Sequence, residues 1–260
     1  MSRRLWTFLA LPLLLGACVQ QPVADIHHPT GRDDVVLKLT DGPGMGTAQT
    51  FFSAPPVLVV TGDGTTYLRG EEVTVQGIVW PVFRYRVSES EVALLLHEAD
   101  RDGLLAPPPD YSPSSPVADG GDTTVTITTG AGTWTHRANG LDDPSREGGA
   151  RGRLADFVAY LERWGRTPGG PAAREIRPTA LRVLAQPAAP DPARGPVSTW
   201  PTAAGIDLAG VGDCAVVRDP VAVRRLTTSE EQYYRQSDET FELAAAVLLP
   251  GDSCESGPAS

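Results

Sequence analysis

The start of the chain constrains most strongly where and how this protein folds. Arg3 and Arg4 precede an apolar run that extends from Leu5 to Leu15. A basic start followed by an apolar segment of this length is typical of a secretory signal peptide, and the run is too short to span a bilayer as a permanent helix. We therefore expect a chain that is exported and that folds in an oxidising compartment.

The apolar run ends in the tetrapeptide Leu15-Gly16-Ala17-Cys18. This tetrapeptide resembles the lipobox of bacterial lipoproteins, which implies a signal peptide over residues 1–17 and diacylglycerol on the thiol of Cys18. The implied address is the extracytoplasmic face of the cell membrane, because two or more acyl chains anchor a protein stably without a membrane span. The alternative is an ordinary signal peptide with an accidental cysteine. Arg3 and Arg4 also fit a twin-arginine signal, although the very short basic region favours the general secretory route.

Two further cysteines, Cys214 and Cys254, remain in the mature chain. An even pair in an exported protein predicts one disulfide, which would close the C-terminal segment. A reactive thiol or a metal site is the alternative, but neither a nearby histidine nor a C-x-x-C spacing accompanies the pair. We expect no metal and no cofactor.

The composition is that of a soluble globular protein with an acidic excess. The formal net charge is -10 and 41% of the residues are hydrophobic. Loss of residues 1–17 removes two arginines and takes the charge to -12. A chain this acidic repels phosphate backbones, so we expect no nucleic-acid partner.

The order of predicted elements indicates an α+β fold with antiparallel sheets and two amphipathic helices. Residues 18–34 form the lipidated cysteine and a flexible tether, in which His27 and His28 are expected to be solvated rather than to bind metal. A domain follows over residues 35–166. Its predicted strands cover residues 35–39, 57–61, 65–69, 73–75, 82–87, 123–129 and 133–137, and its predicted helices cover 88–103 and 150–164. The first strand contains Lys38, the only lysine of the chain.

A Pro- and Gly-rich stretch, residues 167–171, marks a boundary before a C-terminal α/β subdomain over residues 175–260. Strands are predicted at residues 179–184 and 214–217. Asp219 and Pro220 are typical of the start of a helix, which we extend through Leu226. Residues 240–249 fit a helix or a strand on propensity, and we predict a strand because Pro250 and Gly251 end it.

Several of these features together resemble an uncharacterised family of secreted lipoproteins from high-GC Gram-positive bacteria. They are the hairpin around Gly62-Asp63-Gly64, the capped helix that ends in Gly103-Leu104-Leu105, Asp119 ahead of the Thr-rich strand, and the pair of Cys214 with the segment 248–254. The resemblance implies a fold and an extracytoplasmic address. It implies no reaction.

The candidate catalytic features are weak. Gly251-Asp252-Ser253-Cys254 differs by one residue from the Gly-Asp-Ser-Gly around the nucleophile of chymotrypsin-like proteases, but no histidine stands in a matching context, and a disulfide-bearing turn explains it better. His136 with Asp119 or Asp122 could form an acid–base pair, although no nucleophile or metal ligand accompanies it. We therefore predict no catalytic residue.

The sequence favours a lipid-anchored, non-catalytic module that binds an unknown extracellular ligand or protein, or that supports the envelope. The alternative is a cell-envelope hydrolase with an unrecognised site near His136. A third reading is a protease inhibitor, for which the Pro-rich loop over residues 107–116 is the only candidate for an exposed reactive loop.

Overall fold

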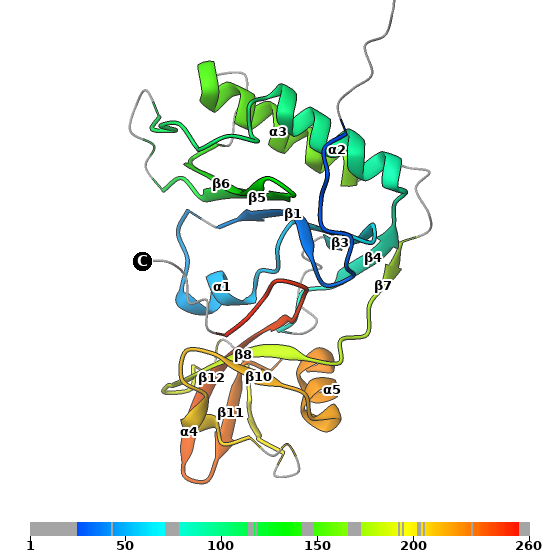
Figure 1. Ribbon diagram of the computed structural model, residues 1–260. Coiled ribbons are helices and arrows are strands. Elements are labelled where there is room, and N and C mark those ends of the chain that lie inside the picture. The colour runs from blue at the N-terminus through cyan, green and yellow to red at the C-terminus, as the bar shows by residue number, and fades with distance from the viewer. Residues whose placement is uncertain are drawn as a thin grey trace, which may run out of the picture.

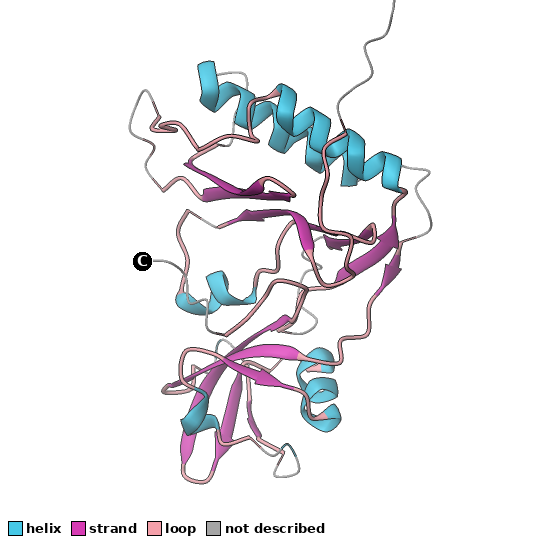
Figure 2. Ribbon diagram, in the orientation of Figure 1, coloured by secondary structure: helices cyan, strands magenta, loops and turns pink. Residues whose placement is uncertain are grey.

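The computed structural model has the predicted α+β architecture, with two separate sheets and five helices among the described residues (Figures 1 and 2). It describes residues 25–42, 44–70, 78–113, 117, 119–141, 148–165, 173–191, 193, 195–201, 204, 206–229 and 231–254. The predicted signal peptide, Cys18, the predicted strand 73–75 and the predicted boundary 167–171 lie outside these residues.

The first sheet has seven strands in the order β6-β5-β1-β2-β3-β4-β7, and all its neighbouring strands are antiparallel. Its strands are β1 (Val35–Asp41), β2 (Leu58–Thr61), β3 (Thr65–Arg69), β4 (Val82–Arg86), β5 (Asp122–Thr129), β6 (Gly132–Asn139) and β7 (Arg174–Glu175). The predicted hairpin of β2 and β3 is confirmed. Gly64 adopts φ +80° at its turn, a conformation that glycine reaches without steric cost.

Helices α2 (Glu89–Arg101) and α3 (Gly149–Gly165) lie together on one face of this sheet (Figure 1). The predicted capping box at the start of α2 is confirmed, because the Ser88 hydroxyl accepts from the Glu91 amide and the Glu91 carboxylate accepts from the Ser88 amide. The apolar side chains of α2 that recur at helical spacing are all buried, and they are Val92, Leu95, Leu96 and Ala99. The first core therefore lies between the helices and the sheet.

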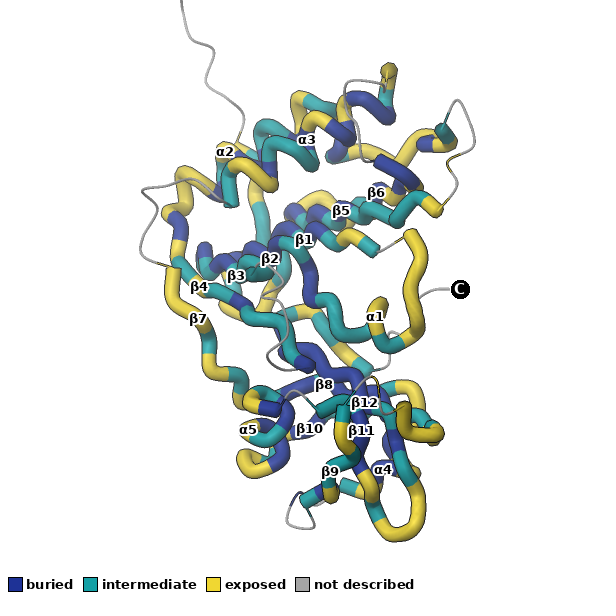
Figure 3. The backbone as a smooth tube through the Cα atoms, turned by 180° about the vertical axis from the view of Figure 1, so that it is seen from behind, coloured by how far each residue is buried: buried dark blue, intermediate teal, exposed yellow. Residues whose placement is uncertain are grey.

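The second sheet has five strands in the order β10-β8-β12-β11-β9. Its strands are β8 (Leu181–Pro187), β9 (Val197–Thr199), β10 (Ala215–Val217), β11 (Tyr233–Gln236) and β12 (Glu239–Val247), with helices α4 (Leu208–Val211) and α5 (Pro220–Thr228) beside it. The ambiguous segment 240–249 is a strand, as predicted. Strands β8 and β12 are largely buried (Figure 3). Val59 and Val82 of the first sheet belong to the second core, so the two halves share it.

Five short elements were not predicted from the sequence: α1 (Ala48–Ser53), β7, β9, α4 and β11. Each has six residues or fewer. β9 pairs with β11 in parallel, whereas the other neighbouring strands of the second sheet are antiparallel. Segments of this length carry too few positions to show a period, so tertiary contacts decide their structure.

Residues 25–34, which we expected to belong to the flexible tether, are docked on the folded domain. Ile26 packs against the first core, and the Gly130 amide donates to the carbonyl of His27 over 2.7 Å. His28, expected to be solvated, has a side chain only 3% exposed, and its Nε2 lies 2.8 Å from a carboxylate oxygen of Glu89. Packing against the folded domain therefore extends upstream of Val35 and includes Ile26 and His28. The partners lie far along the chain, so the local composition gave no sign of them.

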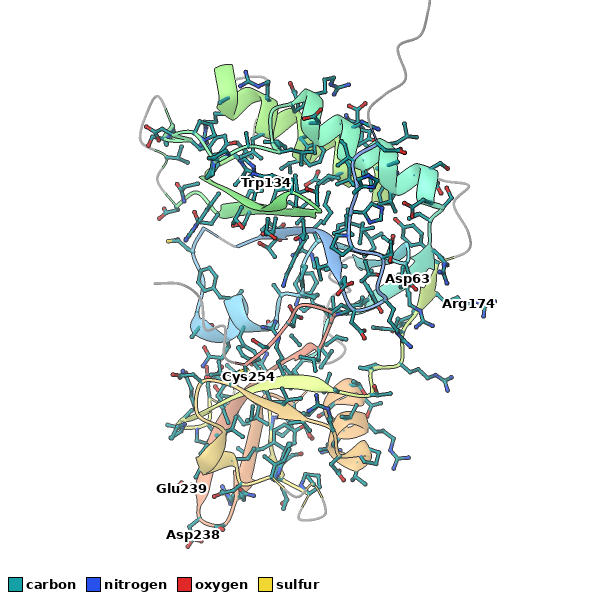
Figure 4. All side chains as sticks on the ribbon, viewed as in Figure 1. Asp63, Trp134, Arg174, Asp238, Glu239 and Cys254 are labelled. Atoms are coloured by element: carbon teal, nitrogen blue, oxygen red, sulfur yellow. A yellow bond between two sulfur atoms is a disulfide. The ribbon has the colours of Figure 1, made fainter. Side chains whose placement is uncertain are left out.

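The predicted disulfide between Cys214 and Cys254 is confirmed, with the two Cα atoms 5.2 Å apart. Cys214 directly precedes β10 and Cys254 follows β12, so the bond ties the end of the chain to the second sheet. Cys254 lies at the end of the second sheet that is nearer the first sheet, whereas the turn at Asp238 and Glu239 lies at the opposite end (Figure 4).

We predict that the double variant Cys214→Ser/Cys254→Ser lowers the free energy of unfolding in urea. The disulfide spans 40 residues. A loop of that length restricts the unfolded chain by about 4 kcal/mol in the loop-entropy model. Reduction of the wild type should give the same loss. An unchanged urea midpoint in both experiments would show that the bond contributes nothing to stability.

Candidate functional site

His136, the one histidine considered for acid–base chemistry, lies on β6 and is fully buried. Its Nδ1 is 2.7 Å from the hydroxyl of Tyr111, and its Nε2 is 2.9 Å from the carbonyl oxygen of Leu104. Because a carbonyl only accepts, Nε2 carries the proton, and Nδ1 accepts from the Tyr111 hydroxyl. Both ring nitrogens are thus engaged within the fold.

The surroundings of His136 favour its neutral form. Burial lowers the pKa of His136, and the hydrogen bond to Leu104 opposes this effect only in part. The buried guanidinium of Arg151 on α3 lies close by and donates to the carbonyls of Tyr111, Asn139 and Gly140 over 2.8, 2.8 and 2.7 Å. Together these contacts fasten the loop after α2, the β5–β6 hairpin and α3 to one another.

The acid–base pair of His136 with Asp122 that the sequence allowed does not form. In the hairpin register Asp122 lies opposite Asn139, whereas His136 lies opposite Val125. Since successive strand residues face opposite sides of a sheet, Asp122 and His136 face opposite sides. The Asp122 carboxylate instead accepts from Arg137 over 2.5 Å, and this bond lowers its pKa. Asp119 lies in the preceding loop at φ +60°.

The described part of the molecule has a second buried polar centre, at Asp252. Its side chain is only 3% exposed, and one carboxylate oxygen, Oδ1, accepts from Nζ of Lys38 over 2.7 Å. The other oxygen, Oδ2, accepts from the amide of Leu249 over 3.2 Å and lies 3.9 Å from Nε of Arg182. Lys38 is on β1 and Arg182 is on β8, so this carboxylate joins the two sheets.

Two neighbouring contacts lie beside this centre. The Phe52 ring of α1 lies 5.3 Å from the Arg182 guanidinium carbon. Gly251 has φ +76°, and a Cβ at that position would lie 2.8 Å from a methyl group of Val35. The turn that carries Asp252 therefore rests directly on β1. The prediction that residues 251–254 form a disulfide-bearing turn is confirmed, whereas the role of Asp252 was not predicted from the sequence.

The Pro-rich loop over residues 107–116 reaches the first of these centres through Tyr111. The Pro-rich loop is exposed from Pro107 to Asp110 and then fixed by the buried Tyr111. No group of three or more His, Cys, Asp or Glu side chains in the described ranges is arranged to hold a metal ion. Among the helices that the structure describes, none is long and apolar enough to cross a membrane.

Comparison with known proteins gives no further assignment. The chain matches no protein-family model, and it shows no significant similarity to a curated protein or to a solved structure.

We predict that His136 makes folding stability depend on pH. The ordinary histidine pKa is 6.5. Because the pKa of the folded state is lower, the unfolded chain takes up a proton first as the pH falls through 6.5, and the folded state loses stability below that value. The slope contributed by one proton is at most about 1.4 kcal/mol per pH unit.

Urea unfolding at pH values on either side of 6.5 measures this dependence. His136→Gln keeps a donor for the Leu104 carbonyl and should reduce the slope. His97→Gln, on the partly exposed side of α2, is the control and should retain it. An equal slope in the wild type and His136→Gln would contradict the prediction.

Proposed function

We propose that this protein is attached by lipid at Cys18 to the extracytoplasmic face of the cell membrane, where its folded part binds an extracellular ligand or protein without catalysis. The proposal rests on three features that follow one another at the start of the chain: two basic residues, a short apolar run and the tetrapeptide Leu15-Gly16-Ala17-Cys18. Small residues before the cysteine suit cleavage by a signal peptidase, and the thiol supplies the sulfur for acylation. The resemblance to secreted lipoproteins of high-GC Gram-positive bacteria agrees with this address.

The disulfide supports an address outside the cytoplasm. Bonds such as Cys214–Cys254 persist in oxidising compartments and are rare where thiols are kept reduced. After cleavage and acylation at Cys18, both remaining cysteines are accounted for by this bond.

The docking of residues 25–34 limits how far the folded part can stand from the anchor. Asp25 lies seven positions after Cys18. A fully extended chain of that length spans about 25 Å at most. The folded part would thus be held close to the headgroups rather than carried on a long stalk.

We base the proposed absence of catalysis on the burial and the hydrogen bonds of His136. A general base needs a ring nitrogen that reaches the substrate. His136 has no exposed surface, and the Tyr111 hydroxyl and the Leu104 carbonyl occupy its two nitrogens. This histidine serves to connect elements of the fold, which favours a binding module over a hydrolase centred on it.

Cys18→Ala tests the anchor. In cells fed a radioactive fatty acid, the wild type should carry the label and sediment with membranes, and Cys18→Ala should carry none. The double variant Cys214→Ser/Cys254→Ser removes the two other cysteines and is the matched control, which should keep the label. An unlabelled wild type, or a label that survives Cys18→Ala, would refute the lipid anchor.

A further inference from the structure

We propose that Lys38 and Asp252 condense into an isopeptide bond, an amide between Nζ of the lysine and Cγ of the aspartate. This bond would covalently join β1 of the first sheet to the C-terminal turn. The proposal does not depend on the lipid anchor or on the binding function.

The choice of residue at position 38 is the first observation. The chain has 22 lysines and arginines, and Lys38 is the only lysine among them. For an ion pair with a buried carboxylate, arginine is the better partner, since its guanidinium is planar, weakly hydrated and always charged. Lysine differs in that it can give up protons and act as a nucleophile. Lys38, the one lysine, thus lies beside a carboxylate with which a nucleophilic amine could react.

The geometry is the second observation. Nζ of Lys38 lies 2.7 Å from Oδ1 of Asp252, and the two side chains are 24% and 3% exposed. The turn holds the carboxylate in place, because the Asp252 amide donates to the Leu249 carbonyl and the Leu249 amide donates to Oδ2. Reacting groups that a fold holds in contact react much faster than the same groups do in an intermolecular reaction.

The ion pair contains the atoms of the product and one water, so the reaction needs no other reagent. One proton passes from the ammonium group to Oδ1, which leaves a neutral amine beside a carboxylic acid. The nitrogen lone pair attacks Cγ and forms the C–N bond. A second proton then passes from Nζ to Oδ1, the Cγ–Oδ1 bond breaks, and Oδ1 leaves as water. Oδ2 becomes the amide oxygen.

The groups around Oδ2 suit that role. In the tetrahedral intermediate negative charge develops on Oδ2, which accepts from the Leu249 amide over 3.2 Å. The positive guanidinium of Arg182 lies 3.9 Å away and stabilises the same charge. Donors placed where charge develops are a principal source of catalysis in acyl transfer. Oδ1, which must leave, is the oxygen that faces the lysine.

The product would add a second covalent closure beside the disulfide. Lys38 and Asp252 are 214 positions apart, and Cys254 follows Asp252 by two residues. With both bonds formed, the C-terminal turn would be fixed to β1 through the amide and to the second sheet through Cys214.

The single lysine permits a direct test with a lysine-specific endoproteinase. The full-length exported protein is extracted from membranes, reduced, denatured and digested. A free Lys38 gives two fragments, whereas an amide at Nζ blocks the only cleavage site. We expect the wild type to stay uncut, and a digest with a second protease to yield a branched peptide of the Lys38 and Asp252 segments, lighter by one water than their sum.

Two variants serve as controls. Asp252→Ala cannot form the bond and should be cut in full, whether or not it folds, which proves that the site is open to the protease. Lys38→Arg keeps the ion pair without a reactive amine, and its peptide around Asp252 should have the unmodified mass. Cleavage of the wild type, or an uncut wild type without the branched peptide, would overturn the proposal.

Discussion

The carboxylate of Asp252 holds the two halves of this molecule in one arrangement. Removal of a charge from water costs several kcal/mol unless partners replace the hydration. Here the partners come from different places: Lys38 from β1, Arg182 from β8 and the amide of Leu249 from the turn itself. None of them alone compensates the buried charge, so both sheets and the turn must be in place together.

The first half contains a buried polar network that works in the same way. Arg151 of α3 is surrounded by carbonyl groups of the loop at Tyr111 and of the chain after β6, and His136 links Tyr111 to the carbonyl of Leu104. These bonds tie loops that would otherwise be loose to the helices and the sheet. A charged or titratable residue inside a fold is often read as a reactive group. In this molecule the contacts of both centres connect elements of the fold. Within the two centres, only Lys38 and Asp252 also lie close enough to react with each other.

Local patterns in the sequence were sufficient to predict the long helices and strands. The capping box at Ser88, the spacing of apolar residues in α2 and Gly64 at the β2–β3 turn each specify their structure within a few residues. The prediction of the strand from Glu239 to Val247 depended on Pro250 and Gly251, which end it. By contrast, α1 and the docking of residues 25–34 depend on surfaces contributed by distant segments, which a local pattern does not contain.

The site was harder to predict than the fold. The hairpin turn at Gly130 and Ala131 fixes the register that separates Asp122 from His136, so a count along the two strands would already have excluded that pair. The partner of Asp252 lies 214 positions away, and no period or motif connects such residues. The isolated lysine in an arginine-rich chain was visible in the sequence, but its meaning required the position of Asp252.

Hydrogen exchange measured by mass spectrometry on the wild type and Asp252→Ala tests most directly whether Asp252 couples the two sheets. If the carboxylate joins them, its loss leaves Lys38 and Arg182 as uncompensated charges on opposite sides of the junction. We expect both β1 and β8 to lose protection in Asp252→Ala, although the two strands lie in different sheets. Faster exchange confined to residues 249–254, with β1 and β8 unchanged, would contradict it.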